Sequence, residues 1–156
     1  MKKLICFVLC TVLYLTMVAC GQKEAKDSGV TPDMQTVYED MKPYLPEDAS
    51  LYNAEFVFNA YGVSSADCKQ QVVLSYYDGA VTAELWLIEA VSKDALTSIK
   101  KLAETRLDGM TEQFKNYDPK AAALCEDAEL FTHGNCLVLM VSDNAQQLLE
   151  IYNASR

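Results

Sequence analysis

Two segments rich in β-branched and aromatic residues, 72–77 and 81–91, are joined through Asp78-Gly79. This dipeptide between two such segments is the strongest short-range signal for a β-hairpin, because its residues tolerate the positive φ angles of tight hairpin turns. An isolated hairpin is marginal in water, so further strands or helices must cover its hydrophobic face. The chain is therefore constrained to a fold that contains an antiparallel sheet.

A second hairpin is expected near the end of the chain. Its strands are residues 129–132 and 136–141, and its turn lies near Gly134-Asn135. Asn and Gly are the residues that two-residue hairpin loops favour. The two hairpins together predict an antiparallel sheet of about four strands.

The longest helix is expected between the two hairpins. Apolar residues spaced three or four apart follow Ser92 and continue to about Tyr117, and Pro119 ends the helix. Gly109 lies inside this segment, where glycine costs about 1 kcal/mol relative to alanine. A kink or a close backbone contact is expected at this position.

Two shorter helices are expected at the ends of the folded region. Thr31 is suited to be an N-cap, with Pro32 as the first helical residue, and Asp143 and Gln146 have the spacing of a capping box. Residues 51–70 fit a strand and a helix face equally well. The order helix, hairpin, long helix, hairpin, helix predicts an α+β fold, with the sheet packed against helices on one side.

The start of the chain combines a charged N-terminus, Met1-Lys2-Lys3, with an apolar run of 16 residues that ends just before Cys20. A helix that spans a bilayer needs about 20 residues, so this run is too short. The pattern resembles the signal of a bacterial lipoprotein. It predicts cleavage after residue 19 and lipidation of Cys20, with an ordinary cleaved signal peptide as the alternative.

These features divide the chain into three parts. Residues 1–19 are expected to be the signal peptide, 20–31 a lipidated N-terminus with a flexible tether, and 32–156 a single α+β domain. The predicted location is the outer face of the cytoplasmic membrane, in the cell envelope. The net charge of −9 disfavours nucleic acid and anionic lipid headgroups, so the lipid itself must supply the membrane attachment.

Several short sequence motifs follow one another along the chain in a distinctive order. They are Tyr61-Gly62-Val63, Asp67, Val72-Val73, Glu84, Arg106, Phe114, Tyr117, Pro119 and Gly134-Asn135-Cys136-Leu137-Val138. In order and spacing they resemble the bacterial lipoproteins that carry domain of unknown function 4358, over roughly residues 50–142. The resemblance implies a small secreted lipoprotein of a Gram-positive bacterium, without an assigned activity, cofactor or substrate.

Three cysteines follow Cys20, so at least one of them stays unpaired. Pairing of Cys125 with Cys136 is one alternative, but the expected hairpin places Cys136 opposite His133 and leaves Cys125 outside that ladder. Small buried apolar residues are the favoured interpretation of Cys68, Cys125 and Cys136.

His133 is the single histidine of the chain. With Cys136 it offers two metal ligands, whereas a closed zinc site needs four and a catalytic one needs three plus water. A solvated turn histidine is therefore favoured, and neither a metal, a cofactor nor histidine-dependent catalysis is expected.

Carboxylate pairs are the remaining route to catalysis. Glu84 with Glu89, or Glu126 with Asp127, could form the two carboxylates of a glycosidase. With 22 acidic residues in the chain, however, such pairs arise by chance, so a solvated acidic surface is favoured.

Two groups of residues are candidates for binding or for a structural role. Tyr76, Tyr77 and Trp86 could form an aromatic platform for a sugar ring or a protein partner, with core packing as the favoured alternative. Arg106 lies inside an apolar helix stripe, so its charge needs a partner. Glu84 is the candidate partner, although the alternation of apolar residues in its strand would point Glu84 away from the core.

The sequence therefore favours a membrane-anchored extracytoplasmic lipoprotein that acts as a non-catalytic binding or protein-interaction module. Its partner would be an envelope protein or a glycan. The alternative is a small cell-envelope hydrolase that uses carboxylates on the sheet. A pocket with two carboxylates of raised pKa would favour the hydrolase, and an exposed aromatic patch without them would favour binding.

Overall fold

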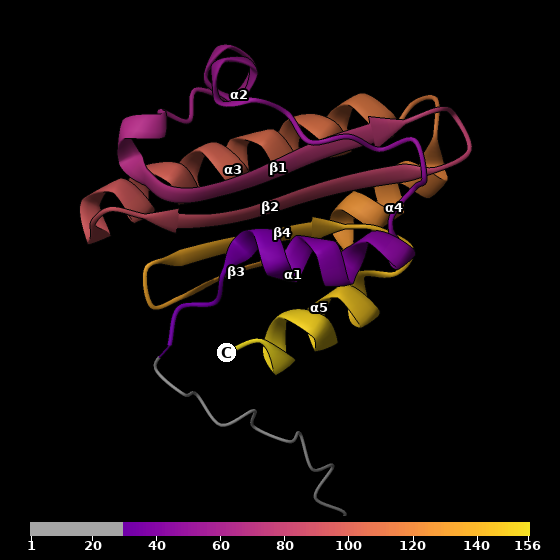
Figure 1. Ribbon diagram of the computed structural model, residues 1–156. Helices are drawn as coiled ribbons and strands as arrows, with labels where there is room; N and C mark the ends of the chain where they lie inside the picture. Colours follow the sequence, from indigo (N-terminus) through magenta and orange to yellow (C-terminus); the bar gives the residue numbers. More distant parts are fainter. Residues whose placement is uncertain (1–29) are drawn as a thin grey trace, which may run out of the picture.

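The computed structural model describes residues 30–156 (Figure 1). The predicted signal peptide, Cys20 and most of the predicted tether lie outside these residues. The elements, in chain order, are α1 Met34–Met41, α2 Ala54–Tyr61, β1 Cys68–Tyr77, β2 Thr82–Ala90, α3 Lys93–Phe114, α4 Pro119–Glu126, β3 Glu129–His133, β4 Cys136–Val141 and α5 Ala145–Ala154, with short 3-10 turns at Lys42–Tyr44 and Ser65–Asp67.

The four strands form one antiparallel sheet in the order β1-β2-β4-β3, and both predicted hairpins are present. The predicted α+β class is confirmed. The first hairpin turns through residues 78–81, a loop longer than two residues, because the Asp78 carboxylate accepts hydrogen bonds of 2.8 Å from the backbone N–H groups of both Ala80 and Val81. Gly79 has a φ of +87° in this loop, which glycine adopts without strain.

Helices cover both faces of the sheet, and the expectation that they lie on one side is wrong (Figure 1). One hydrophobic cluster lies between the sheet and α2, α3 and α4, and a second lies between the sheet and α1 and α5. The physical reason is visible in β2 and β4, in which every residue is buried. Strands that are covered on both faces have continuous rather than alternating apolar residues.

The expected long helix is present as α3, and Ser92 is its N-cap. No atom lies within 4 Å of the place where a Cβ on Gly109 would be, so the close contact expected there is not formed. Pro119 was expected only to end this helix, but it also begins α4. Asp118 caps α4 through a hydrogen bond, and proline suits the first turn of a helix because its missing N–H needs no partner.

The predicted starts of the terminal helices need correction. Asp33, not Thr31, is the N-cap of α1, because its carboxylate accepts a 2.7 Å hydrogen bond from the N–H of Thr36. The N-cap of α5 is Asn144, which makes no side-chain capping bond, so the proposed capping box that begins at Asp143 is not formed.

The ambiguous segment 51–70 contains α2 and the chain that covers the edge of β1. The backbone N–H of Tyr52 donates to the carbonyl of Val73 at 2.9 Å, and its hydroxyl donates to the carbonyl of Ser75 at 3.1 Å. Gly62 ends α2 with a φ of +78°. Among residues 30–156, no helix has both the length and the apolar composition needed to cross a bilayer.

Candidate functional site

Arg106 on α3 forms a bidentate ion pair with Glu84 on β2. Its Nε lies 3.0 Å from Oε1 and its Nη2 lies 3.0 Å from Oε2 of the carboxylate. The expected contact is therefore present. The objection that Glu84 would point away from the core does not hold, because both faces of β2 are buried and Glu84 is on the face that packs against α3.

The Glu84 carboxylate accepts three hydrogen bonds from side chains. The indole Nε1 of Trp86 donates to it at 2.9 Å, in addition to the two bonds from Arg106. The Glu84 side chain is fully buried, whereas 28% of the Arg106 side chain is exposed. A buried carboxylate needs such compensation, because the loss of hydration is not recovered without a charged partner and hydrogen bonds.

The aromatic rings of Tyr61 and Trp86 lie next to this ion pair. The Arg106 guanidinium lies over the Tyr61 ring at 5.1 Å, and the ring of Tyr61 lies 5.1 Å from that of Trp86. Burial, and then the charge of Glu84, raise the pKa of Tyr61 to about 12, so its phenol is neutral at physiological pH. Although burial disfavours its charge, the hydrogen bonds to Glu84 raise the pKa of Arg106 above its ordinary value.

The outer side of Arg106 lines a cleft between β1 and α3, here called the Arg106 cleft, with a volume of about 230 Å³. At its far end, the Tyr77 ring packs 5.0 Å from Phe114 and 6.2 Å from Tyr117. Tyr77 and Tyr117 are 42% and 55% exposed, respectively. The residues that line the cleft are Ser75, Tyr76, Tyr77, Thr82, Arg106, Met110, Gln113, Phe114 and Tyr117.

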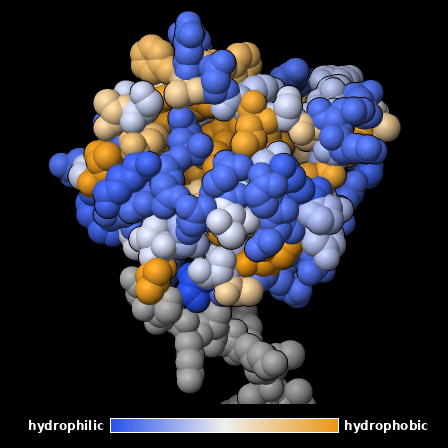
Figure 2. Space-filling view, in the orientation of Figure 1, coloured by the Kyte–Doolittle hydropathy of each residue, from blue (hydrophilic) through white to orange (hydrophobic). Residues whose placement is uncertain are grey.

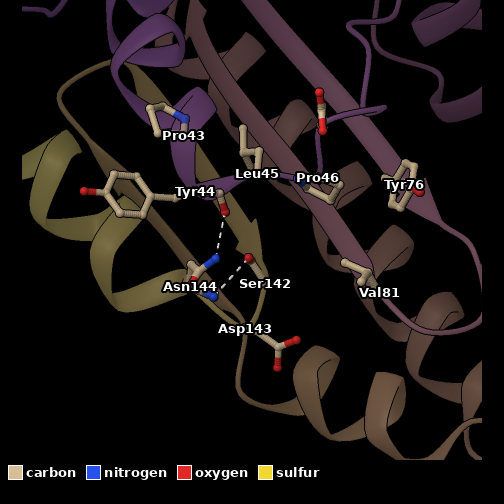
Figure 3. Close-up of a pocket in the computed structure, with 10 residues that line it drawn as sticks. Pro43, Tyr44, Leu45, Pro46, Tyr76, Val81, Ser142, Asp143 and Asn144 are labelled. Atoms are coloured by element: carbon tan, nitrogen blue, oxygen red, sulfur yellow. Dashed lines mark hydrogen bonds between the residues drawn. The ribbon is translucent and has the colours of Figure 1, made fainter.

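A second cleft, of about 410 Å³, lies on the other side of the β1–β2 turn and includes Tyr76 and Val81 (Figure 3). Its polar groups hold the local loops together. The Asn144 side chain donates to the carbonyl of Tyr44 at 2.9 Å, and the backbone N–H of Asn144 donates to Ser142 Oγ at 3.1 Å. This cleft contains no arginine or lysine, so the Arg106 cleft is the stronger candidate site.

The predicted aromatic platform is not formed. Tyr76 packs on the side of the sheet that carries α1, Tyr77 lies on the α3 side, and Trp86 is fully buried. Neighbouring residues of a strand point to opposite faces, which separates the two tyrosines. The sequence interpretation missed Phe114 and Tyr117, which join Tyr77 instead. Their spacing of three at the end of the long helix was the available signal.

A separate group of exposed apolar side chains lies on α2. Val57 is the one buried residue of this helix, whereas Phe56 and Phe58 are 44% and 55% exposed. Figure 2 shows hydrophobic residues gathered along the sheet below α2, surrounded by hydrophilic residues. Glu55 and Asn59, also exposed on α2, are polar residues of this helix, and neither of the two clefts above is lined by a residue of α2.

The carboxylates considered for catalysis do not converge. Glu84 faces α3, whereas Glu89 accepts hydrogen bonds from Lys69 at 3.0 Å and from Gln70 at 2.9 Å, on the side of the sheet where Gln70 also bonds to the start of α1. The bond from Gln70, and then that from Lys69, lower the pKa of Glu89, which is the opposite of what a general acid needs. Glu126 and Asp127 are exposed at the end of α4.

The cysteines lie apart in the fold. Cys125 belongs to the cluster under α3 and α4, and Cys136 belongs to the cluster under α1 and α5, so the sheet separates them and the disulfide is not formed. Cys136 faces His133 across the β3–β4 ladder, as expected. No group of three or more His, Cys, Asp or Glu side chains suited to a metal occurs within the part of the chain that the structure describes.

Burial also lowers the reactivity of Cys68 and Cys125 at neutral pH. It raises the pKa of Cys68 and of Cys125 to about 11 in each case. The thiolate is the nucleophilic form of cysteine, and a pKa of this size leaves very little of it at neutral pH. Neither side chain has the electropositive environment that a catalytic cysteine requires.

These features define a small α+β domain, with a four-stranded antiparallel sheet between two helical layers and a partly buried Arg–Glu pair beside an aromatic cleft. The chain belongs to the family defined by a domain of unknown function (DUF4358), whose model matches residues 49–142. The match extends from the segment before α2 to the end of β4, so it contains the whole Arg106 cleft. Comparisons with curated proteins and with solved structures gave no significant match.

Proposed function

We propose that this protein is a lipid-anchored lipoprotein of the cell envelope, and that it acts as a non-catalytic binding module with the Arg106 cleft as its ligand site. One observation carries the choice of site. Nε and Nη2 of Arg106 are occupied by Glu84, whereas Nη1 makes no hydrogen bond to any part of residues 30–156. A fixed, partly exposed guanidinium with unused donors next to exposed aromatic rings is typical of a ligand site.

The same geometry argues against the hydrolase alternative. The two sheet carboxylates, Glu84 and Glu89, are held on opposite faces by different partners. They therefore cannot flank one scissile bond, which the two-carboxylate mechanism requires. Binding without chemistry needs only the cleft.

The membrane anchor is proposed from the sequence around Cys20. Figure 1 places the first described residues and the C-terminus at one end of the molecule, and the β1–β2 turn at the other. A tether that joins the domain at the first of these ends leaves the Arg106 cleft, beside that turn, facing away from the membrane. This orientation suits a ligand in the extracytoplasmic space.

Metabolic labelling with radioactive palmitate tests the anchor. We expect the wild-type chain to carry the label in the membrane fraction and Cys20→Ser to lose both label and membrane retention, since stable anchoring needs the acyl chains. Cys10→Ser, inside the predicted signal peptide, is the matched control and should label normally. Equal labelling of Cys20→Ser and wild type would overturn the proposed anchor.

Nuclear magnetic resonance of the ¹⁵N-labelled full chain tests the binding role. The chain has two arginines and one tryptophan, so the side-chain N–H signals of Arg106 and Trp86 report directly on the site, and Arg156 serves as an internal reference. We expect one soluble class of envelope fragments, either glycan or peptide, to shift the Arg106 and Trp86 signals and to be recovered unchanged. Cleavage of that fragment would favour the hydrolase, and the absence of shifts with every class would contradict the proposed site.

A further inference from the structure

The charge of the Arg106 cleft is balanced before any ligand binds. The guanidinium is paired with Glu84 through two contacts of 3.0 Å, and the Asp118 carboxylate lies 3.2 Å from the Tyr77 hydroxyl at the other end. The chain as a whole has a net charge of −9. An anionic ligand would meet a compensated cation in a negative field, so the cleft favours an uncharged ligand.

The unused polar groups of the cleft suit a ligand that carries hydroxyl groups. Arg106 Nη1 offers donors, while the Thr82 hydroxyl and the Gln113 amide can both donate and accept. Neither of the latter two side chains makes a hydrogen bond within the described residues, and the residues Thr82, Arg106 and Gln113 all line the cleft. A hydroxyl group on a ligand also both donates and accepts, so it can pair with each of these groups.

The aromatic end of the cleft is fixed in position and open to solvent. Phe114, which is 5% exposed, supports the Tyr77 ring, and the Tyr77 hydroxyl donates to Asp118. The Tyr117 ring stands nearly perpendicular to that of Tyr77, at an interplanar angle of 85°. Aromatic faces carry partial negative charge, which attracts the weakly positive C–H groups of a saturated ring.

The volume of about 230 Å³ limits the size of the ligand. At roughly 30 Å³ for each water molecule, the cleft holds the equivalent of about seven to eight waters. Pockets for drug-sized ligands are about 300–1,000 Å³. The cleft can therefore hold one ring, and the rest of a longer ligand must lie outside.

From these four properties we infer that the Arg106 cleft binds a single uncharged sugar unit of a glycan. The sugar ring stacks on Tyr117 and contacts the nearly perpendicular Tyr77 ring at its edge, and its hydroxyl groups bond to Arg106 Nη1, Thr82 and Gln113. This inference rests on the proposed binding function, because it names the ligand class of the same site. One ring in an open cleft should bind with a Kd of about 1 mM.

Nuclear magnetic resonance titration of the ¹⁵N-labelled full chain, in micelles of a detergent without sugar groups, tests the inference. The probes are glucose, galactose and N-acetylglucosamine as neutral sugars, glucuronate as an anionic sugar, and N-acetylphenylalanine amide as a peptide-like ligand. We expect at least one neutral sugar to shift the Arg106 and Trp86 side-chain signals and to bind at least as tightly as glucuronate. The signal of Arg156 should not move.

Variants at exposed aromatic residues distinguish a loss of binding caused by the missing ring from a loss caused by unfolding. Tyr117→Ala should weaken sugar binding at least tenfold, and Tyr117→Phe, which keeps the ring, should bind like wild type. Phe58→Ala is the matched control, because Phe58 is also 55% exposed but lies on α2, and it should not change the affinity.

The possible failures are distinguishable. Shifts with N-acetylphenylalanine amide but with no neutral sugar would overturn the sugar inference and leave the binding function standing. Tighter binding of glucuronate than of every neutral sugar would overturn the argument from charge. No shift with any probe, together with no shift in the titration with envelope fragments, would overturn both proposals.

Discussion

At the scale of single residues, the carboxylate of Glu84 is a buried charge that needs compensation. It is fully buried and accepts hydrogen bonds from two groups of Arg106 and from the indole of Trp86. A buried ion pair adds little net stability relative to apolar residues of the same shape, but removing one partner leaves an uncompensated charge. The pair therefore fixes Arg106 in one orientation beside the cleft, with Nη1 left without a hydrogen bond within residues 30–156.

Arg106→Met should lower the free energy of unfolding by about 3 kcal/mol at pH 7, because Glu84 stays buried without its counterion. Urea denaturation measures this loss. Glu84→Gln, which keeps an acceptor for Trp86, should cost less than Arg106→Met. An equal loss in Glu84→Gln and Arg106→Met would show that the buried charge is not the cause.

The rate at which the half-buried thiol of Cys68 reacts with iodoacetamide should keep rising with pH beyond the range of an ordinary thiol. Burial, and then the neighbouring Asp67, raise its pKa to about 11, so the thiolate fraction should still increase about tenfold per pH unit between pH 7 and pH 10. An ordinary thiol, with a pKa of about 8.5, stops gaining rate above pH 9. Mass spectrometry of the peptide that contains Cys68 gives the rate, and a plateau near pH 9 would contradict the raised pKa.

At the scale of elements, local signals predicted where most helices and strands lie but not every start. Pro119 predicts the end of the long helix, and Asp118 before it is an equally local signal for the N-cap of a new helix. The Arg106–Glu84 contact could be predicted because a charge in an apolar stripe needs a partner. The aromatic group of Tyr77, Phe114 and Tyr117 could not be predicted from the sequence. It joins a strand and a helix, and their relative placement is decided only by the tertiary packing.

Two glycines on helices should respond to alanine in opposite ways. Gly62 ends α2 with a φ of +78°, so Gly62→Ala should destabilise the protein by about 1 kcal/mol through backbone strain. Gly109 lies in α3 with no atom within 4 Å of an added Cβ, so Gly109→Ala should stabilise by about 1 kcal/mol. Urea denaturation of both variants against wild type measures the signs. A destabilising Gly109→Ala would mean that glycine is needed there for a contact or a bend.

At the scale of the whole molecule, one sheet serves two hydrophobic cores. β2 and β4 contribute residues to both clusters, so each face of the sheet depends on strands that the other face also holds. The number and class of the strands could be predicted from the two hairpins. The side on which each helix packs was not predicted. The continuous apolar run in residues 85–88 indicates a strand covered on both faces, but it does not show which helix covers which face.

This shared sheet predicts that residues 32–156 unfold as one cooperative unit. Leu148 on α5 is buried in the cluster under α1, whereas Trp86, the single tryptophan, is buried on the opposite face under α3. Leu148→Ala should cost about 2–5 kcal/mol of stability. It should therefore move the urea midpoint of Trp86 fluorescence as far as that of far-ultraviolet circular dichroism, although the mutated side chain lies across the sheet from the indole. Ile99→Ala, on the Trp86 side, is the matched control and should also shift both midpoints together. Two separate transitions in Leu148→Ala, with Trp86 fluorescence unchanged in the first, would show that the two faces unfold independently and that the domain is not one unit.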